Sequence, residues 1–330
     1  MSDHQALVET RQVKSAVALA LGTGGARGLA HIGAIEAVEA AGYRIVAVSG
    51  SSMGALIGGI YAAGKLGVYR DWVCALQKMD VLKLVDWTLS GAGLIKGERI
   101  IGVLRELIGD VAIEELPIPF TAVATDLDRE REVWLSRGSL FEAIRASIAI
   151  PTIFRPYHYE GRLLVDGGLL NPLPVSPTLR DMTDCTIAVD INAPAEPLDG
   201  GTAAGASDRG AAGQASPEML PEAKPYEGHR ASYRQRIGEF VESMMEKRAH
   251  PTAIAEPGAF ELFARSLDTV QETITRLKLA AEPPDLLITI PRNAAAFYEF
   301  HRADELIELG RKRTREALKR WHIPAPRRRR

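Results

Sequence analysis

Short, continuous hydrophobic runs alternate with longer amphipathic segments along this chain. Residues 17–21 and 45–48 are apolar throughout, which is typical of parallel strands that are buried on both faces. An amphipathic segment at residues 29–41 follows the first run, and a tightly packed helical segment at residues 55–63 follows the second. This repeated strand-loop-helix unit predicts an α/β fold, with three α/β/α layers around a central, mostly parallel sheet.

The same patterns predict further elements as far as the end of the chain. Strands are predicted at residues 120–125, 131–135, 161–165, 185–191 and 285–290, and a hairpin at residues 157–160. Helices are predicted at residues 68–79, 98–108, 140–149, 233–248, 259–279 and 301–321.

One long segment lacks a folding pattern. Residues 193–230 are rich in Gly, Ala, Ser, Pro and Glu and have almost no large apolar side chains, so we expect a disordered insertion. The chain then divides into a polar N-terminal segment at residues 1–15, a main domain at residues 16–180 and a C-terminal extension at residues 181–330. We expect the extension to complete the fold with further strands and helices.

Composition narrows the class of protein. The 330 residues are 46% hydrophobic and 25% charged, as in ordinary globular proteins. Cys74 and Cys185 are too few for a disulfide framework and show no metal-ligand spacing, so we expect inert thiols in a reducing compartment and no metal site. The start of the chain lacks a signal-peptide pattern, and no apolar run approaches the roughly 18 residues of a membrane span. We therefore expect a cytoplasmic protein, soluble or peripheral at a membrane.

Charge is nearly balanced but unevenly distributed. The net charge of −2 creates no overall field that would attract nucleic acid, and no nucleic-acid partner is expected. Basic residues crowd the end of the chain, at residues 311–330. Two interpretations of this basic tail stay open, a solvated end and a peripheral contact with a membrane or another polyanion. The oligomeric state is also left open.

The segment Gly50-Ser51-Ser52-Met53-Gly54 lies where the second predicted strand turns into a helix. Such a turn forces the backbone through a strained corner, and small residues at Gly50 and Gly54 permit it. Ser52 would then project at a helix N-terminus, where partial positive charge stabilises an alkoxide or an oxyanion. The pattern fits a nucleophilic serine, although a plain strand-to-helix turn explains it as well.

The glycine-rich loop at residues 22–28 also joins a strand to a helix, which permits two functional interpretations. A dinucleotide-binding loop fits poorly, because Thr23 stands where its first glycine belongs and the strand at residues 45–48 ends without an acidic residue. An oxyanion hole fits better, since the N–H groups of Gly24 and Gly25 can approach a tetrahedral intermediate closely. Arg27, followed by Gly28, would add positive charge suited to a phosphate head group, or would simply pin the loop.

A nucleophilic serine needs a base, and the seven histidines are poorly placed for that role. His31, one turn into the first helix, is expected to pack or to cap there. Asp166 is the better candidate, because it ends an apolar strand and the following Gly167 and Gly168 let its carboxylate project near other backbone. For it to act directly on serine, either burial would have to raise its pKa or the site would have to favour the oxyanion strongly. Taken without its neighbours, Asp166-Gly167-Gly168 is also explained as a simple turn.

Together these segments resemble the patatin-like phospholipases, in their bacterial, neuropathy-target-esterase-like branch. The resemblance covers residues 17–179 and rests on three motifs in order: Gly22-Thr23-Gly24-Gly25-Ala26-Arg27-Gly28, Gly50-Ser51-Ser52-Met53-Gly54, and Asp166-Gly167-Gly168-Leu169-Leu170-Asn171-Pro172. The segments Ala124-Thr125-Asp126-Leu127 and Ala146-Ser147-Ile148-Ala149-Ile150-Pro151 support it. Thr23 departs from the family pattern, since it replaces the first glycine of the usual triplet.

The resemblance implies a patatin-like fold and a Ser-Asp dyad that needs no catalytic histidine. In this chain it assigns Ser52 as nucleophile, Asp166 as proton acceptor, and Gly24 and Gly25 as oxyanion donors, with His31 as part of the scaffold. It implies no metal or organic cofactor. The expected activity is hydrolysis of an acyl lipid, with a phospholipid or lysophospholipid favoured. The alternative is a catalytically silent, membrane-associated regulator that keeps the fold.

Overall fold

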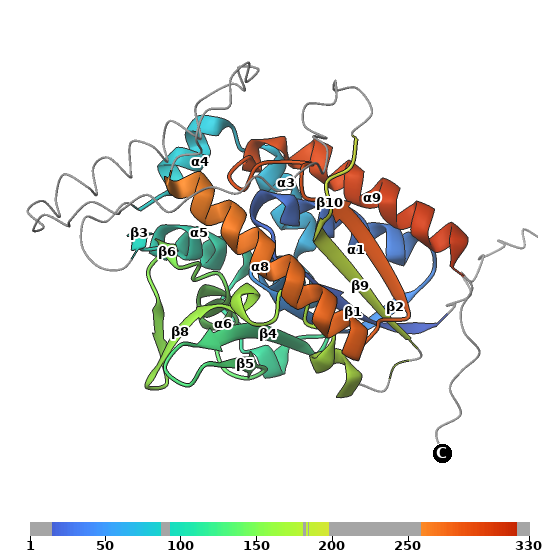
Figure 1. The fold of residues 1–330 in the computed structure, drawn as a ribbon, viewed down its shortest axis with the longest axis horizontal. Helices are drawn as coiled ribbons and strands as arrows, with labels where there is room; N and C mark the ends of the chain where they lie inside the picture. The colour runs from blue at the N-terminus through green and yellow to red at the C-terminus, as the bar shows by residue number, and fades with distance from the viewer. Residues whose placement is uncertain (1–14, 87–92, 181–182, 184, 198–258, 322–330) are drawn as a thin grey trace, which may run out of the picture.

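A single, mostly parallel sheet forms the centre of the protein (Figure 1). The computed structural model describes residues 15–86, 93–180, 183, 185–197 and 259–321. The strands of the main sheet are β1 (Ala16–Leu21), β2 (Arg44–Ser51), β4 (Phe120–Asp126), β5 (Arg131–Leu135), β7 (Tyr157–Tyr159), β8 (Arg162–Asp166), β9 (Cys185–Ala193) and β10 (Leu286–Pro291). Hydrogen-bonded pairs connect them in the sequence β10-β9-β1-β2-β4-β8-β7, and β5 also pairs with β4. The pairs from β10 to β4 are parallel and the others antiparallel.

Helices cover both faces of this sheet. In Figure 1, α8 crosses in front of the strands while α1 lies behind them. The α-helices are α1 (Ala30–Ala40), α2 (Met53–Ala62), α3 (Leu66–Cys74), α4 (Lys78–Leu84), α5 (Glu98–Ile108), α6 (Leu140–Ser147), α8 (Ala259–Ala281) and α9 (Ala303–Arg320). The short 3-10 helices are η1 (Gly25–Leu29), η2 (Ile113–Glu115), η3 (Gly167–Leu169), η4 (Ser176–Arg180) and η5 (Phe300–Arg302), and a second small sheet pairs β3 (Gly93–Ile95) with β6 (Thr152–Phe154). The predicted three-layer α/β/α architecture is confirmed.

One predicted helix is wrong in its extent. The amphipathic pattern at residues 68–79 predicts a single helix, but α3 ends at Cys74 and α4 begins at Lys78. Gln77 has an extended backbone, and its side chain and that of Asp80 form a reciprocal capping box that starts the new helix. The helix start signal at Gln77 therefore divides a segment whose hydrophobic periodicity predicts one continuous helix.

The C-terminal part of the chain completes the main sheet. Strand β9 lies between β1 and β10, so the extension that begins at residue 181 supplies strands directly beside β1. Ala193, where we expected the insertion to begin, is instead the buried last residue of β9. The rest of the expected insertion, residues 198–230, and the helix predicted at residues 233–248 lie outside the described residues. Residues 1–14 and 322–330 also lie outside them. None of the described helices is long and apolar enough to cross a membrane.

Candidate active site

The ends of two strands meet at one edge of β4. Ser51, the last residue of β2, pairs with Val123, and Asp166, the last residue of β8, pairs with the next residue, Ala124. Strand β5 pairs with the same part of β4 and therefore occupies its opposite edge. Since a strand has only two edges, β2 and β8 must share one and approach each other end to end. This pairing brings Ser52 and Asp166 together although 114 residues separate them along the chain.

Ser52 occupies the sharp corner between β2 and α2. Its backbone φ of 55° lies in a region that residues other than glycine rarely adopt. Ser52 is also almost completely buried. A Cβ atom on Gly50 would lie 2.3 Å from the backbone of Gly54, and one on Gly54 would lie 2.1 Å from the carbonyl oxygen of Leu21. The corner therefore closes only with glycine on both sides of Ser52.

Ser147, at the end of α6, holds this corner in place. The Ser52 N–H donates to Ser147 Oγ at 2.9 Å, and Ser147 Oγ donates to the Val123 carbonyl at 2.6 Å. Ser147 lies in one of the segments that carry the family resemblance, but its sequence context predicts no role for it. No local spacing signals the contact, because it joins residues 95 apart in the chain.

The Asp166 carboxyl is buried, and its two oxygens have different surroundings. Oδ1 accepts a hydrogen bond from the Gly168 N–H at 2.7 Å, whereas Oδ2 accepts none of good geometry from the described residues. Burial raises the pKa of Asp166 from 3.8 to about 7, and hydrogen bonding from the Ser52 side chain and the Gly168 N–H opposes that rise. A carboxyl with this pKa is present in both its protonated and its ionised form near neutral pH.

The glycines after Asp166 permit close contact with the strand beside them. A Cβ atom on Gly167 would lie only 2.0 Å from the Val123 carbonyl oxygen, and one on Gly168 would lie 2.8 Å from Gln271 of α8. Thr125 donates its hydroxyl to the Asp166 carbonyl oxygen at 3.0 Å. The structure therefore supports the interpretation of this motif as a fixed carboxylate mount rather than a free turn.

Backbone hydrogen bonds fix the glycine-rich loop on both sides of its centre. The N–H groups of Gly22 and Thr23 donate to the carbonyls of Val189 and Pro172, and the N–H of Ala26 donates to Phe297. Within the described part of the chain, no hydrogen bond engages the N–H of Gly24 or Gly25, which lie at the start of η1. These are two donors that an oxyanion can use.

The positions within this loop differ in what they tolerate. Gly25 has a φ of +57°, and a Cβ atom there would lie 2.3 Å from the Phe297 ring, so glycine is required. Gly28 similarly lets η1 approach α2, because a Cβ atom there would lie 2.4 Å from Cβ of Met53. Thr23 is not among the residues with positive φ. A threonine in place of glycine is therefore compatible with the loop.

His31 is part of the scaffold in this structure. It is fully buried, and its Nε2 lies 2.8 Å from the Gly22 carbonyl oxygen. Burial lowers its pKa to about 4, so the ring is neutral at pH 7 and donates to that carbonyl. The other described histidines, His158 and His301, do not line the cavity beside Ser52.

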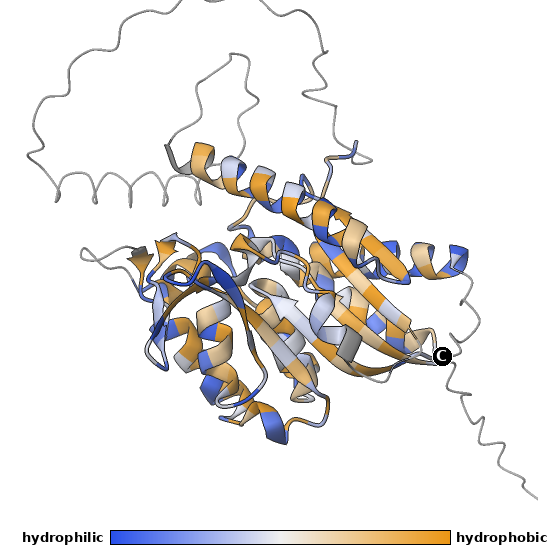
Figure 2. Ribbon diagram, turned by 60° about the horizontal axis from the view of Figure 1, so that its bottom comes forward, coloured by the Kyte–Doolittle hydropathy of each residue, from blue (hydrophilic) through white to orange (hydrophobic). Residues whose placement is uncertain are grey.

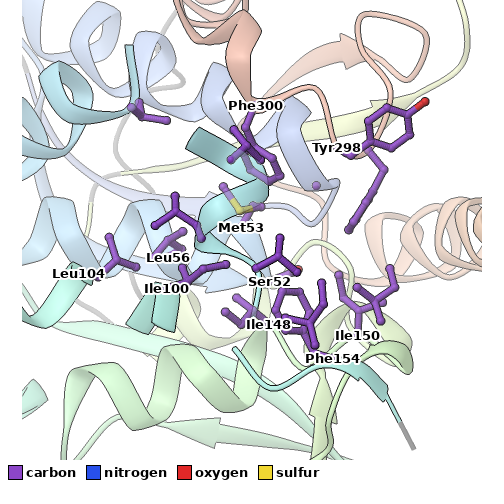
Figure 3. Close-up of a pocket in the computed structure, with 18 of the residues that line it drawn as sticks. Ser52, Met53, Leu56, Ile100, Leu104, Ile148, Ile150, Phe154, Tyr298 and Phe300 are labelled. Carbon is purple, nitrogen blue, oxygen red and sulfur yellow. The ribbon is translucent and has the colours of Figure 1, made fainter. Parts of the chain in front are cut away.

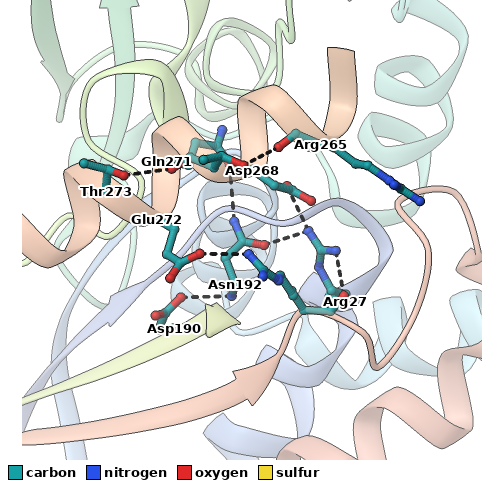
Figure 4. A network of polar contacts seen from close by, with 10 residues as sticks. Arg27, Asp190, Asn192, Arg265, Asp268, Gln271, Glu272 and Thr273 are labelled. Atoms are coloured by element: carbon teal, nitrogen blue, oxygen red, sulfur yellow. Dashed lines mark hydrogen bonds and ion pairs between the residues drawn. The ribbon is translucent and has the colours of Figure 1, made fainter. Parts of the chain in front are cut away.

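Arg27 is held by protein acceptors in a buried network (Figure 4). Its guanidinium donates to Asn192 Oδ1 at 2.6 Å and to the Arg292 carbonyl at 2.9 Å, and it pairs with Asp268 of α8 at 3.3 Å. Asn192 also donates to Gln271 of α8 at 3.3 Å. The network supports the interpretation of Arg27 as a pin for the loop. Its role toward a phosphate group stays a prediction.

An apolar cavity of about 130 Å³ opens beside Ser52 (Figure 3). Ser52 and Gly25 form its polar edge, and the rest of the lining is aliphatic and aromatic. In the view of Figure 3, the side chains of Leu56, Ile100 and Leu104 extend to one side of Ser52. The cavity suits an acyl chain, which gains free energy from leaving water. No cluster of potential metal ligands occurs among the described residues.

The chain is similar in sequence to known proteins. The family model described as "Patatin-like phospholipase" matches residues 19–179. An NTE family protein of Mycobacterium tuberculosis (strain ATCC 25618 / H37Rv), named as uncharacterized, is 40% identical over 93% of this chain and 92% of its own length. The neuropathy target esterase of Drosophila virilis is 34% identical over 48% of this chain and 11% of its own length. The match to the crystal structure of VipD from Legionella pneumophila covers 90% of this chain and 67% of the VipD chain, with 15% sequence identity and a TM-score of 0.35.

Proposed function

Because this chain belongs to the patatin-like phospholipase family, in its NTE branch, we propose that it is a serine lipid acyl hydrolase with a Ser-Asp dyad. Family membership by itself suggests a hydrolase that acts on lipid esters. The finer proposal is cleavage of a carboxylic ester of a phospholipid or lysophospholipid through an acyl-serine intermediate. The observation that carries it is that Ser51, the residue before Ser52, and Asp166 pair with consecutive residues along one edge of β4.

The reaction begins when Asp166 accepts the hydroxyl proton of Ser52. The Ser52 oxygen forms a bond to the ester carbonyl carbon, and the carbonyl oxygen becomes an oxyanion held by the N–H groups of Gly24 and Gly25. The intermediate collapses with cleavage of the carbon-oxygen bond to the alcohol, which takes the proton from Asp166. The acyl group is then bound to Ser52.

Water completes the cycle with the same groups. Asp166 accepts a proton from a water molecule, which attacks the acyl carbon, and the glycine N–H groups again stabilise the oxyanion. Cleavage of the bond to Ser52 returns the proton from Asp166 to the serine oxygen and releases a fatty acid. No step of this cycle requires a metal or an organic cofactor.

The apolar cavity supports an acyl substrate. A chain bound next to Ser52 would contact Leu56, Ile100 and Leu104, and its ester carbonyl would lie near Gly25. A lipid panel that varies acyl length and head group therefore tests the substrate class. Replacing Leu104, which is buried, with the larger Phe should shift the preference toward shorter acyl chains.

The decisive experiment uses Ser52→Ala and a fluorophosphonate probe that labels activated serines. We expect the wild-type protein to hydrolyse esters and to be labelled at Ser52, and the variant to lose at least a thousandfold in kcat while remaining folded. Full activity in Ser52→Ala would refute the proposed Ser-Asp dyad. A wild-type protein that is neither labelled nor active would favour the membrane-associated regulator instead.

A further inference from the structure

Helix α8 crosses in front of the strands of the main sheet (Figure 1), and apolar and polar residues alternate along it (Figure 2). On its inner side, Gln271 is buried against Gly168 of the aspartate motif. Phe263 and Leu267 line a second, smaller cavity of about 30 Å³ together with Gly24. One face of this helix therefore forms a wall of the site.

The opposite face of α8 exposes large apolar side chains. Leu262, Val270 and Leu277 expose 56%, 49% and 67% of their surface. Positions separated by seven and eight residues lie close to one side of an α-helix, because 3.6 residues make one turn. The three side chains therefore form one row along the helix, in a protein where most large apolar residues are buried.

The hydroxyl groups between these apolar residues are already satisfied. Ser266, Thr269 and Thr273 are exposed, yet each donates to the carbonyl four residues earlier, at 2.8, 2.8 and 3.0 Å. A hydroxyl that is bonded within its own helix costs less to move from water into a less polar medium. The polar residues of this face are therefore compatible with partial burial in a lipid interface.

Charge on α8 is divided between its two faces. The acidic residues Asp268 and Glu272 face inward, where they pair with Arg27 at 3.3 Å and with Arg292 at 2.8 Å. Along the described outer face, the exposed charged residues are Arg265 and Arg276, and none is acidic. An apolar row flanked by basic side chains is the arrangement by which amphipathic helices bind anionic lipid surfaces.

We propose that the outer face of α8, formed by Leu262, Arg265, Val270, Arg276 and Leu277, docks the protein on an anionic lipid bilayer. The apolar side chains enter the boundary between head groups and acyl chains, and the two arginines contact the lipid phosphates. The proposal rests on the proposed lipid acyl hydrolase, since docking through α8 would bring the wall of the site to its substrate. The apolar contribution does not depend on salt, whereas the arginine contribution does.

The test measures co-sedimentation with vesicles of phosphatidylcholine and phosphatidylglycerol, and with vesicles of phosphatidylcholine alone. All proteins carry Ser52→Ala, so that no lipid is consumed and binding is measured independently of hydrolysis. One variant adds Arg265→Gln and Arg276→Gln, and a second adds Leu262→Gln, Val270→Gln and Leu277→Gln. Glutamine favours helices, so α8 should remain formed.

The matched control adds Lys65→Gln and Arg137→Gln, which remove the same charge from exposed positions outside α8 and outside the basic tail. At about 1 kcal/mol per basic residue, the α8 arginine variant should bind mixed vesicles about 30-fold more weakly at low salt. The α8 apolar variant should also bind more weakly at high salt, and the control should bind as strongly as its parent. An equal loss in the control, or no loss in either α8 variant, would overturn the proposal.

A second measurement separates this proposal from the proposed function. In proteins that retain Ser52, both α8 variants should hydrolyse a soluble short-chain ester as fast as the wild-type protein, because the changed side chains lie on the outer face. A similar loss of this activity in both would mean that the changes damage the fold or the site, and would also overturn the proposal. If neither the wild-type protein nor any variant hydrolyses an ester, the proposed hydrolase activity is refuted, but the result of the vesicle binding test is unaffected.

Discussion

The burial of Asp166 should lower the stability of the folded protein while it prepares the carboxyl to act as a base. The pKa of this carboxyl is raised from 3.8 to about 7 in the folded protein by burial. In the unfolded chain it ionises near its ordinary pKa, so the unfolded state releases the proton at a lower pH. The contribution of Asp166 to stability is therefore most favourable at low pH, and it is lost as pH rises from the unfolded pKa through the folded one.

The size of this effect follows from the two pKa values. At about 1.4 kcal/mol per pKa unit, the difference between 3.8 and about 7 costs the fold about 4 kcal/mol at pH values above 7. About 3 kcal/mol of it develops between pH 5 and pH 8. Asp166→Asn cannot ionise, and its amide oxygen can still accept the hydrogen bond from the Gly168 N–H, which is 2.7 Å long in the wild-type protein. We therefore expect an inactive variant that gains stability relative to the wild-type protein as pH rises.

The assay is urea unfolding of the wild-type protein and Asp166→Asn at pH 5 and pH 8. The difference between their free energies of unfolding should change by about 3 kcal/mol between the two pH values, in favour of the variant at pH 8. Groups that titrate equally in both proteins cancel in this comparison. Ser52→Ala is the control, because it keeps the carboxyl and should keep the pH dependence. A difference that is the same at both pH values would refute the reasoning.

Four further results are expected. The kcat/KM for a soluble ester should rise with pH through an apparent pKa near 7, as Asp166 deprotonates in the free enzyme, and a flat profile from pH 5 to 8 would exclude a carboxylate base. Gly25→Ala should lower kcat about a hundredfold or more, measured by steady-state kinetics, because its Cβ would lie 2.3 Å from the Phe297 ring. His31→Ala should lower the free energy of unfolding by about 2 to 4 kcal/mol, because it leaves a cavity and removes a buried hydrogen bond. The midpoint of the pH-rate profile should stay the same, and a shifted midpoint would mean that the histidine takes part in catalysis. Deletion of residues 327–330, which lie outside the described residues, should weaken vesicle binding at low salt. Unchanged binding would refute a membrane contact of the basic tail.

Local patterns were sufficient for most of the fold. Continuous apolar runs predicted β1 and β2, and the polar turn at residues 126–129 separated β4 from β5. These elements follow from interactions between residues close in the chain, so a short window contains the relevant information. The break between α3 and α4 was missed because the capping pair of Gln77 and Asp80 competes with an otherwise helical pattern.

The candidate site divides in the same way. Gly50 and Gly54 could be recognised from the sequence because the corner at Ser52 is a local backbone geometry. The contact of Ser147 with the Ser52 N–H could not, since it depends on how α6 packs beside β4. The contacts that hold Arg27 could not be recognised either, since Asn192 and Asp268 of α8 come from distant parts of the chain.

The sequence by itself determined which residues are able to form a strained serine corner, a glycine-rich donor loop and a carboxylate mount. Only the tertiary structure decided that they meet. Ser52 and Asp166 are brought together by strand pairing along one edge of β4, and the pKa of Asp166 is raised because the whole fold removes water from it. Conformation at a glycine is a local property, whereas proximity and desolvation depend on every layer that closes over the site.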